Sequence, residues 1–142
     1  MRRYEEELKL IGYCGIYCRL CDYFTGKFRE VGGKALEIVE KHPELKIFAE
    51  YSREFNYEDF MKGLRWLSTE IGPCIGACRG GGGWSECPLR KCCIEKGVTF
   101  CYECKEYPCK IIKEQFPRAE ERLNELKKLE IEEWVKKQLG TA

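Results

Sequence analysis

The eleven cysteines among 142 residues carry the most visible chemistry of this sequence. Three of them lie in Cys14–Cys21 with the spacing Cys-x3-Cys-x2-Cys, and the other eight lie between Cys74 and Cys109. Thiolates separated by two or three residues can bind the same metal ion, and two such turns complete a tetrahedral shell of four sulfurs. The spacing therefore predicts metal binding more directly than it predicts a reaction.

The second cysteine stretch contains pairs of the same kind. Cys101-Tyr102-Glu103-Cys104 resembles a zinc knuckle, in which backbone amides donate hydrogen bonds to the sulfurs. Cys92 and Cys93 are adjacent, so we expect one to be a ligand and the other a core residue or free thiol. Ten ligands fill two four-coordinate sites and leave two thiols over. We therefore expect two or three zinc ions. A third complete shell would need His42, which we expect to be solvated.

Three other uses of the cysteines have to be weighed. The spacing of Cys14–Cys21 is also that of radical S-adenosylmethionine enzymes, but the sequence lacks the alternating strands and helices of their barrel. An iron–sulfur cluster in electron transfer or redox chemistry is the main alternative to zinc. An enzyme with an open catalytic zinc is the second alternative, and we expect a non-enzymatic role over it. Disulfides are disfavoured because the number of cysteines is odd and no signal peptide is evident.

The charge balance narrows the class of partner. Lys and Arg number 25 and Asp and Glu number 24, so the whole chain offers no general attraction to nucleic acid or anionic lipid. No apolar run reaches the length of a transmembrane helix, and the charged start at Met1–Glu7 does not resemble a secretion signal. We expect a cytoplasmic protein without membrane association, and a protein partner stays open.

The elements that must position the cysteines are mainly helices. Residues 22–73 contain no cysteine and predict three helices: one over Lys34–Lys41, one from Pro43, and one that begins after Asn56 and ends at Gly72-Pro73. Residues 74–109 are rich in Gly, Pro and turn-forming residues, which predicts no long element. Helices resume at Lys110, with a break at Phe116-Pro117. Their apolar stripe should pack on the domain; it comprises Leu123, Leu126, Leu129, Trp134 and Leu139.

These elements predict a single α-rich small domain over residues 1–142, with irregular zinc-stapled loops and little or no regular β-sheet beyond short knuckle hairpins. Its parts are a first metal turn over 14–21, a helical insert over 22–73, a second metal stretch over 74–109 and C-terminal helices over 110–142. Because only the cysteine-poor parts show apolar periodicity, we expect the core there. The cysteine-rich part should then depend on its metal for order.

The ordered series of cysteine motifs resembles domain-of-unknown-function family 3795. The motifs that carry the resemblance are Tyr13–Tyr23 (YCGIYCRLCDY), Cys74–Cys78 (CIGAC), Cys87–Cys92 (CPLRKC), Glu95–Val98 (EKGV) and Cys101–Cys109 (CYECKEYPC). Members are small cysteine-rich proteins of archaea and bacteria that are expected to bind zinc, and no activity is known for them. The resemblance therefore implies a zinc-binding protein of unknown biological role, with the metal mainly structural and with a binding module as one form of that role.

By position, the resemblance also implies a set of ligands. It excludes Cys93, which falls where the family commonly has a small residue. The middle motif departs from the family's usual Cys-x2-Cys because Ala77 adds a residue between its cysteines. The implied ligands are Cys14, Cys18, Cys21, Cys74, Cys78, Cys87, Cys92, Cys101, Cys104 and Cys109.

Overall fold

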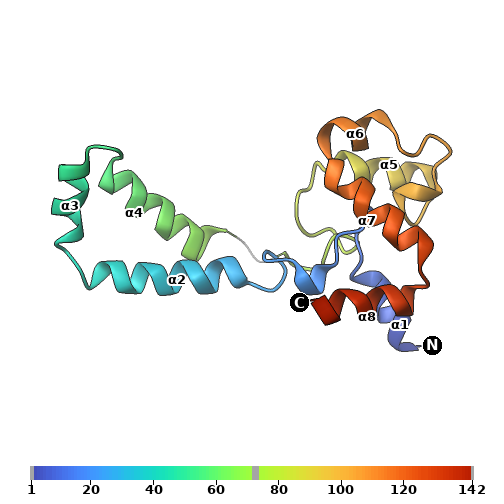
Figure 1. The fold of residues 1–142 in the computed structure, drawn as a ribbon, viewed down its shortest axis with the longest axis horizontal. Helices are drawn as coiled ribbons and strands as arrows, with labels where there is room; N and C mark the ends of the chain where they lie inside the picture. The colour runs from blue at the N-terminus through green and yellow to red at the C-terminus, as the bar shows by residue number, and fades with distance from the viewer. Residues whose placement is uncertain (1, 72–73, 142) are drawn as a thin grey trace. The chain divides into compact units, whose positions relative to one another are not determined.

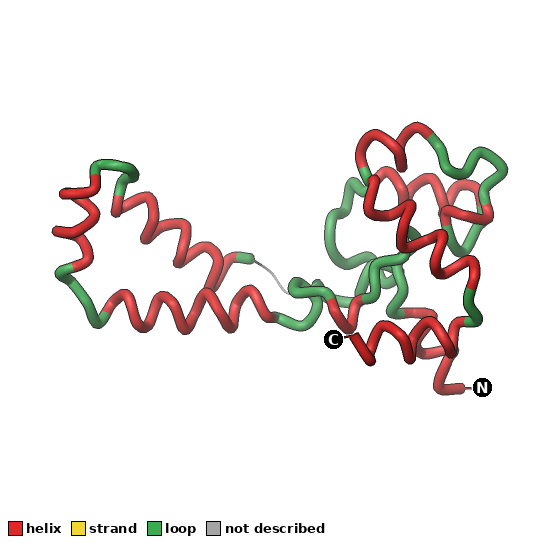
Figure 2. The backbone as a smooth tube through the Cα atoms, in the orientation of Figure 1, coloured by secondary structure: helices red, strands yellow, loops and turns green. Residues whose placement is uncertain are grey.

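The protein is described here by a computed structural model that covers residues 2–71 and 74–141. The described residues are rich in helix and contain no β-strand, only an isolated antiparallel bridge between Ile11 and Tyr17. The prediction of an α-rich fold is confirmed (Figures 1 and 2). No helix of the described chain is long and apolar enough to cross a membrane.

The chain divides into two compact units. Met1–Phe24 and Cys74–Ala142 form one, which we call the cysteine unit because it contains all eleven cysteines; Thr25–Pro73 forms the other, the helical unit. The helical unit nearly coincides with the cysteine-free insert expected at 22–73. The expectation that residues 1–142 behave as a single domain stays a prediction.

The helical unit consists of three helices and a terminal π-helical turn. They are α2 (Lys27–Glu40), α3 (Leu45–Ser52), α4 (Tyr57–Arg65) and η2 (Trp66–Glu70). Asn56 caps α4 as predicted, since its Oδ1 accepts a 2.9 Å hydrogen bond from the Asp59 amide. The first helix begins at Lys27, seven residues before the predicted start at Lys34. The predicted stop at Gly72-Pro73 lies outside the described residues.

One close approach joins the two ends of the helical unit. Gly32 of α2 faces η2, and a Cβ at this position would lie 3.1 Å from the Leu67 side chain and 3.2 Å from its backbone. Arg29 lies one turn earlier and donates hydrogen bonds to the carbonyls of Thr69 (2.7 Å) and Ile71 (2.9 Å). These bonds satisfy carbonyl groups that the end of a helix leaves without partners. The pair of contacts fixes η2 against α2.

The cysteine unit contains more helix than the sequence predicted. Its elements are α1 (Arg2–Lys9), η1 (Cys18–Leu20), α5 (Pro88–Lys96), η3 (Cys101–Glu103), α6 (Lys110–Gln115), α7 (Pro117–Lys128) and α8 (Ile131–Thr141). The expectation of no long element in residues 74–109 is wrong at α5, which has Pro88 in its first turn and Gly97 in the left-handed conformation at its C-cap. The break at Phe116-Pro117 is confirmed between α6 and α7.

The hydrophobic core lies in the cysteine unit. Helix α7 packs against α6, α8 and η3, and α1 packs against α8. The least exposed large side chains are Ile11, Ile112, Leu123, Leu126 and Trp134, each 0–1% exposed. The prediction that the apolar stripe packs on the domain is confirmed for Leu123, Leu126, Leu129 and Trp134 and is wrong for Leu139, which is 49% exposed. The expectation that the core lies in the cysteine-poor parts is confirmed for the C-terminal helices and wrong for the insert. The core also draws on residues between the cysteines, such as Leu89 and Phe100.

Candidate metal centre

A short loop closed by backbone hydrogen bonds positions the first cysteine turn. Gly12 donates to the carbonyl of Ile16 (2.7 Å), and Cys18 donates to the carbonyl of Leu10 (2.8 Å). Gly15 has a φ of +81° at the tip of this loop, where a Cβ would lie 3.1 Å from Arg122 Cβ. Cys18 then opens η1, and the Cys21 amide donates to the Cys18 carbonyl at 3.0 Å. The loop and turn together hold Cys18 and Cys21 on one side of the chain.

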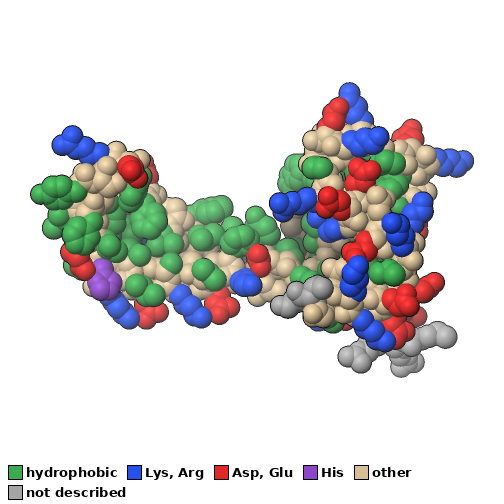
Figure 3. Space-filling view, in the orientation of Figure 1, with side chains coloured by type: hydrophobic (Ala, Val, Ile, Leu, Met, Phe, Trp, Pro, Cys, Tyr) green, Lys and Arg blue, Asp and Glu red, His purple; other side chains and the backbone are tan. Residues whose placement is uncertain are grey.

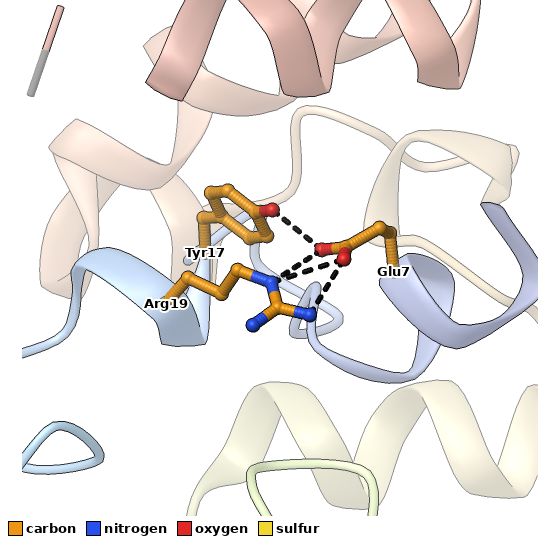
Figure 4. Close-up of polar contacts among 3 residues, drawn as sticks. All are labelled: Glu7, Tyr17 and Arg19. Atoms are coloured by element: carbon orange, nitrogen blue, oxygen red, sulfur yellow. Dashed lines mark hydrogen bonds and ion pairs between the residues drawn. The ribbon is translucent and has the colours of Figure 1, made fainter. Parts of the chain in front are cut away.

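Glu7 of α1 holds this turn from outside. Its carboxylate accepts a 2.5 Å hydrogen bond from the Tyr17 hydroxyl and hydrogen bonds from the Arg19 guanidinium at 2.7–3.0 Å (Figure 4). Burial, together with the negative charge of Glu7, raises the pKa of Tyr17 to about 12, so the hydroxyl remains a donor. Because Tyr17 and Arg19 flank Cys18, the contact with Glu7 fixes the backbone on both sides of that cysteine.

The second segment reaches the same region through a tight turn at Cys74–Cys78. Ala77, the residue that lengthens this motif, is 2% exposed and has a φ of +59°, a left-handed conformation unusual for alanine. Its carbonyl accepts a 2.7 Å hydrogen bond from Gly82. A Cβ on Gly82 would lie 2.7 Å from Cys74 Sγ. Only glycine therefore lets the returning chain approach the Cys74 sulfur this closely.

Four thiols from these two segments form the first sulfur group: Cys18, Cys21, Cys74 and Cys78. Burial raises the pKa of Cys18, and negative charge on each of the other three members would raise it further. Burial also raises the pKa of Cys74, with a contribution from Cys21. The Cys78 amide donates a hydrogen bond to Cys18 Sγ. Pairs of cysteines 53 to 60 positions apart in the sequence are therefore close neighbours in space.

Backbone N–H groups point at three of these sulfurs. Besides the Cys78 amide at Cys18, the Tyr13 amide donates to Cys78 Sγ and the Gly83 amide donates to Cys74 Sγ. Each of these bonds lowers the pKa of its thiol and so opposes the effect of burial. Amide donors of this kind stabilise thiolate and fix its orientation around a metal.

Arg90 of α5 supplies a buried positive charge beside this group. The residue is 8% exposed, and its guanidinium donates hydrogen bonds to the carbonyls of Cys78 (3.0 Å), Gly82 (2.6 Å) and Trp84 (2.9 Å). It also lowers the pKa of Cys78 and Cys74. One side chain therefore ties together the loop that carries two cysteines and partly compensates their negative charge.

The second sulfur group lines a cavity of about 80 Å3 within the cysteine unit. Helix α5 contributes two of its thiols, η3 begins with a third, a fourth follows η3, and a fifth caps α6. The Cys101 amide donates to the carbonyl of Tyr13 (3.1 Å), which links this group to the first cysteine turn. Apolar side chains, including those of Leu89 and Ile112, form the rest of the wall. The five thiols are Cys92, Cys93, Cys101, Cys104 and Cys109.

Two contacts distinguish the members of the second group. Cys93 Sγ lies 3.4 Å from Cys101 Sγ, and this hydrogen bond raises the pKa of Cys101 and lowers that of Cys93, because the two thiols share a proton. Lys96 Nζ lies 3.2 Å from Cys104 Sγ and 3.2 Å from a Glu106 carboxylate oxygen. The Glu106 amide also donates to Cys104 Sγ, so the pKa of Cys104 is lowered. The knuckle predicted at 101–104 therefore has an amide–sulfur bond at its second cysteine.

Two of the expected ligands stand apart from these groups. Cys14 lies between them, since negative charge on Cys14 would raise the pKa of both Cys78 and Cys101. Arg122 donates to the carbonyl of Cys14 at 3.4 Å, and its Nη2 is 3.9 Å from Cys14 Sγ. Cys87 is the N-cap of α5 and packs against the core. The structure places neither residue within one sulfur group.

In residues 2–71 and 74–141, no group of three or more Cys, His, Asp or Glu side chains has the arrangement needed to hold a metal ion. The eleven cysteines are free thiols. His42 is exposed as expected, and its Nδ1 lies 2.8 Å from Glu44 Oε1 in the helical unit, which contains no cysteine.

The sequence did not predict that Arg90 and Lys96 lie beside the sulfurs, nor that Cys93 contacts Cys101. Arg90, Lys96 and Cys93 all lie on α5, the helix that was not predicted. Pro88 after Cys87 and Gly97 after Lys96 were usable signals for the ends of that helix. A helix between them would have placed residues 89, 92, 93 and 96 on one face, which is the face that lines the cavity.

A family model described as "Protein of unknown function (DUF3795)" matches residues 10–114. The chain belongs to DUF3795. The matched segment contains all eleven cysteines and the whole helical unit, whereas α1, α7 and α8 lie outside it. The cysteine motifs had predicted this membership, which is confirmed. No curated protein and no solved structure matches this DUF3795 chain at the level that indicates a relative.

Proposed function

We propose that the cysteine unit is a zinc-binding module whose metal is mainly structural. One observation carries the proposal: Cys18 and Cys21 share a neighbourhood with Cys74 and Cys78, which come from a distant part of the chain. Four thiol donors from two turns are the donor set that structural zinc prefers. The amide donors and Arg90 around the sulfurs supply the environment that thiolates in such a site require.

The residues present fit zinc in chemistry, although their side chains do not yet form a closed shell. At the first sulfur group, Cys18, Cys21, Cys74 and Cys78 would hold one ion. At the second, four of the five thiols that line the cavity would hold another, which leaves Cys14 and Cys87 outside both sites. Bound zinc would connect η1, the 74–78 turn, α5, η3 and α6 across the loops that join them. The two sites would then supply the zinc-stapled loops that the sequence predicts.

Element analysis of the purified full-length protein tests this function. We expect two zinc ions per chain and, by X-ray absorption, sulfur ligands at about 2.3 Å. The variant Cys18→Ser should lose about one ion, and Cys104→Ser should lose the other. A matched control is Thr99→Ser, an exposed position that belongs to neither group, which should keep both ions. A folded protein with neither zinc nor iron would contradict the proposal.

The size of the second cavity favours one further candidate, an iron–sulfur cluster with a redox role. A cavity of about 80 Å3 is several times the roughly 10–15 Å3 that one water molecule requires, so it has room for more than a single ion. Thiolates are the usual ligands of such clusters. A brown anaerobic preparation with charge-transfer absorption that disappears in Cys104→Ser would favour the cluster. A colourless protein that contains zinc would reject it.

A further inference from the structure

The helical unit buries little of its apolar surface. Among the hydrophobic side chains of residues 25–71, those of Ala49 and Met61 are buried, at 6% and 5% exposed. Units of this size without metal or disulfides are marginally stable even when their core is well filled. The large apolar residues that remain more than 40% exposed are Val31, Ile38, Ile47, Phe48, Tyr51, Phe55, Phe60 and Trp66. The helical unit would therefore be stabilised by a partner that covers these exposed apolar side chains.

Helix α3 shows where that surface lies. At 100° per residue, its apolar and small side chains from Ile47 through Tyr51 and Phe48 to Leu45 and Ala49 cover more than half of its circumference. Its charged residues occupy the remaining narrow strip. A helix that packs against its own unit on a single side has a much narrower apolar stripe. Because Ala49 is buried while Ile47, Phe48 and Tyr51 are 55%, 63% and 84% exposed, the outer part of this arc has no cover within the unit.

A groove and a projecting side chain lie next to each other on this surface. The groove has a volume of about 320 Å3 and is lined by Leu45, Phe48, Phe55 and Phe60 together with other, mainly apolar, residues of the helical unit. The rings of Phe55 and Phe60 meet edge to face at 5.8 Å, which fixes one wall. Tyr51 is beside it on α3, and hydrophobic side chains gather over this part of the unit (Figure 3). A hollow and a protrusion on one face can match the same face of a second molecule.

We propose that this face, defined by Ile47, Phe48, Tyr51, Phe55 and Phe60, is the contact between two copies of this chain. In a two-fold dimer the Tyr51 ring of each copy enters the groove of the other, as an isologous interface requires. The exposed parts of these five side chains amount to roughly 600 Å2, because large apolar side chains carry on the order of 200 Å2 each. A standard interface uses about 800 Å2 per partner, of which a little over half is apolar. The face is therefore large enough for a stable dimer.

The charges of the helical unit favour a second copy over an anionic partner. Residues 25–73 contain eight Lys and Arg and nine Asp and Glu, a net charge of −1. Such a surface does not attract nucleic acid or anionic lipid. Lys46 of α3 and Glu58 of α4 form an ion pair at 3.4 Å, so charge at this edge is compensated within each copy. Two identical faces can approach without a large electrostatic penalty.

Sedimentation of the metal-loaded full chain over a range of concentrations tests the proposal. We expect a dimer whose dissociation constant rises at least about tenfold in Tyr51→Glu and in Phe48→Glu, since buried aromatic anchors dominate such contacts. Both side chains are exposed in the single chain, so neither change should unfold it. Leu139→Glu is the matched control: it introduces the same charge at a half-exposed apolar position of α8 and should leave the dissociation constant unchanged.

Photo-crosslinking distinguishes a second copy of the chain from other occupants of this face. A photo-crosslinking residue is placed at position 51, and isotopically light and heavy protein are mixed in equal amounts. We expect mixed light–heavy crosslinks to the peptide that contains Phe55 and Phe60. A monomer at every concentration would overturn the proposal, and so would a dimer that both glutamate variants leave intact. Crosslinks confined to one chain would equally overturn the proposal, and their presence on peptides of residues 1–24 or 74–142 would show that the cysteine unit covers this face. None of these outcomes bears on the metal content, so the zinc proposal is tested separately.

Discussion

The cysteine unit and the helical unit reach order by different means. The cysteine unit combines a hydrophobic core around Trp134 and Leu123 with side chains that bind backbone carbonyls, as Arg90 does, and with two groups of thiols. The helical unit contains α2, the longest helix of the described residues, but buries Ala49 and Met61 as its principal apolar side chains among residues 25–71. Helical periodicity alone therefore does not separate the helices that form the core, such as α7, from those that remain largely exposed, such as α3. A stretch rich in cysteine, glycine and turns can contain more buried apolar surface than a regular helical segment.

Removal of metal should affect the two units most unequally. If zinc joins the sulfur groups, a strong chelator should cost the cysteine unit at least about 5 kcal/mol and lower its melting temperature by on the order of 20 °C. Hydrogen exchange measured by mass spectrometry should show lost protection in residues 74–109 and little change over α2 and α4. Re-addition of zinc is the control. Equal loss of protection in both units, or no loss in either, would break the comparison.

Arg90→Gln should give the next largest effect. The substitution leaves the carbonyls of Cys78, Gly82 and Trp84 without their shared donor and removes a buried charge, so we expect a loss of about 3 kcal/mol. Chemical denaturation followed by circular dichroism measures this loss. Arg118→Gln on the exposed surface of α7 is the control and should change stability by less than about 0.5 kcal/mol. If both variants behave alike, Arg90 does not organise the 74–84 loop.

Glu7→Gln tests the support of the first cysteine turn from α1. The amide keeps the shape of the carboxylate but loses the charge that accepts bonds from Tyr17 and Arg19. We expect a cost of about 2 kcal/mol, confined to the cysteine unit and measurable by denaturant titration. Glu6→Gln is the control, because Glu6 is exposed and pairs with Lys9 in a surface contact at 3.0 Å. A cost as small as that of the control would show that Cys18 needs no such support.

Asn56→Ala should have the smallest effect and should be limited to the helical unit. Loss of the cap at α4 costs about 1 kcal/mol, whereas Asn56→Ser, which keeps a capping oxygen, should cost much less. Amide exchange over residues 57–65 measures the change. We expect the exchange of α7 in the cysteine unit to be unaffected. Faster exchange in both units would show that they unfold together.

The sequence predicted the fold best where a local rule acts on a few neighbouring residues. Asn56 as a cap, Phe116-Pro117 as a break and the Leu123–Trp134 stripe all follow from positions within one or two turns of helix. Helix α5 was missed because residues 74–109 were interpreted as irregular ligand loops, although one of the adjacent cysteines was expected to be a core residue or free thiol and Cys93 is 2% exposed. The core was predicted correctly in the C-terminal helices but not in the cysteine-rich part, since it joins residues as distant in the sequence as Ile11 and Ile112.

The candidate site divides in the same way. Spacing singled out the thiols as candidate ligands, and it predicted a knuckle at Cys101 and Cys104. Spacing could not pair Cys18 and Cys21 with Cys74 and Cys78, because 52 residues separate the two segments and a linear pattern does not fix the distance between them in space. The buried guanidinium of Arg90 was equally invisible, because its partners are backbone carbonyls that any residue type provides.

The backbone hydrogen bond between Cys74 and Tyr23 bears on how well this fold tolerates insertions and deletions in its sequence. The Cys74 amide donates to the Tyr23 carbonyl at 3.4 Å, so the chain enters and leaves residues 25–73 at nearly the same point. A segment with adjoining ends behaves as a removable cassette, since a short turn can close the same gap and loop length changes the closing entropy only slowly. Both cysteine segments would keep their places if that cassette were shortened, exchanged or deleted. The cysteine unit should therefore keep its structure when the length of the helical unit, which carries the exposed aromatic face, varies.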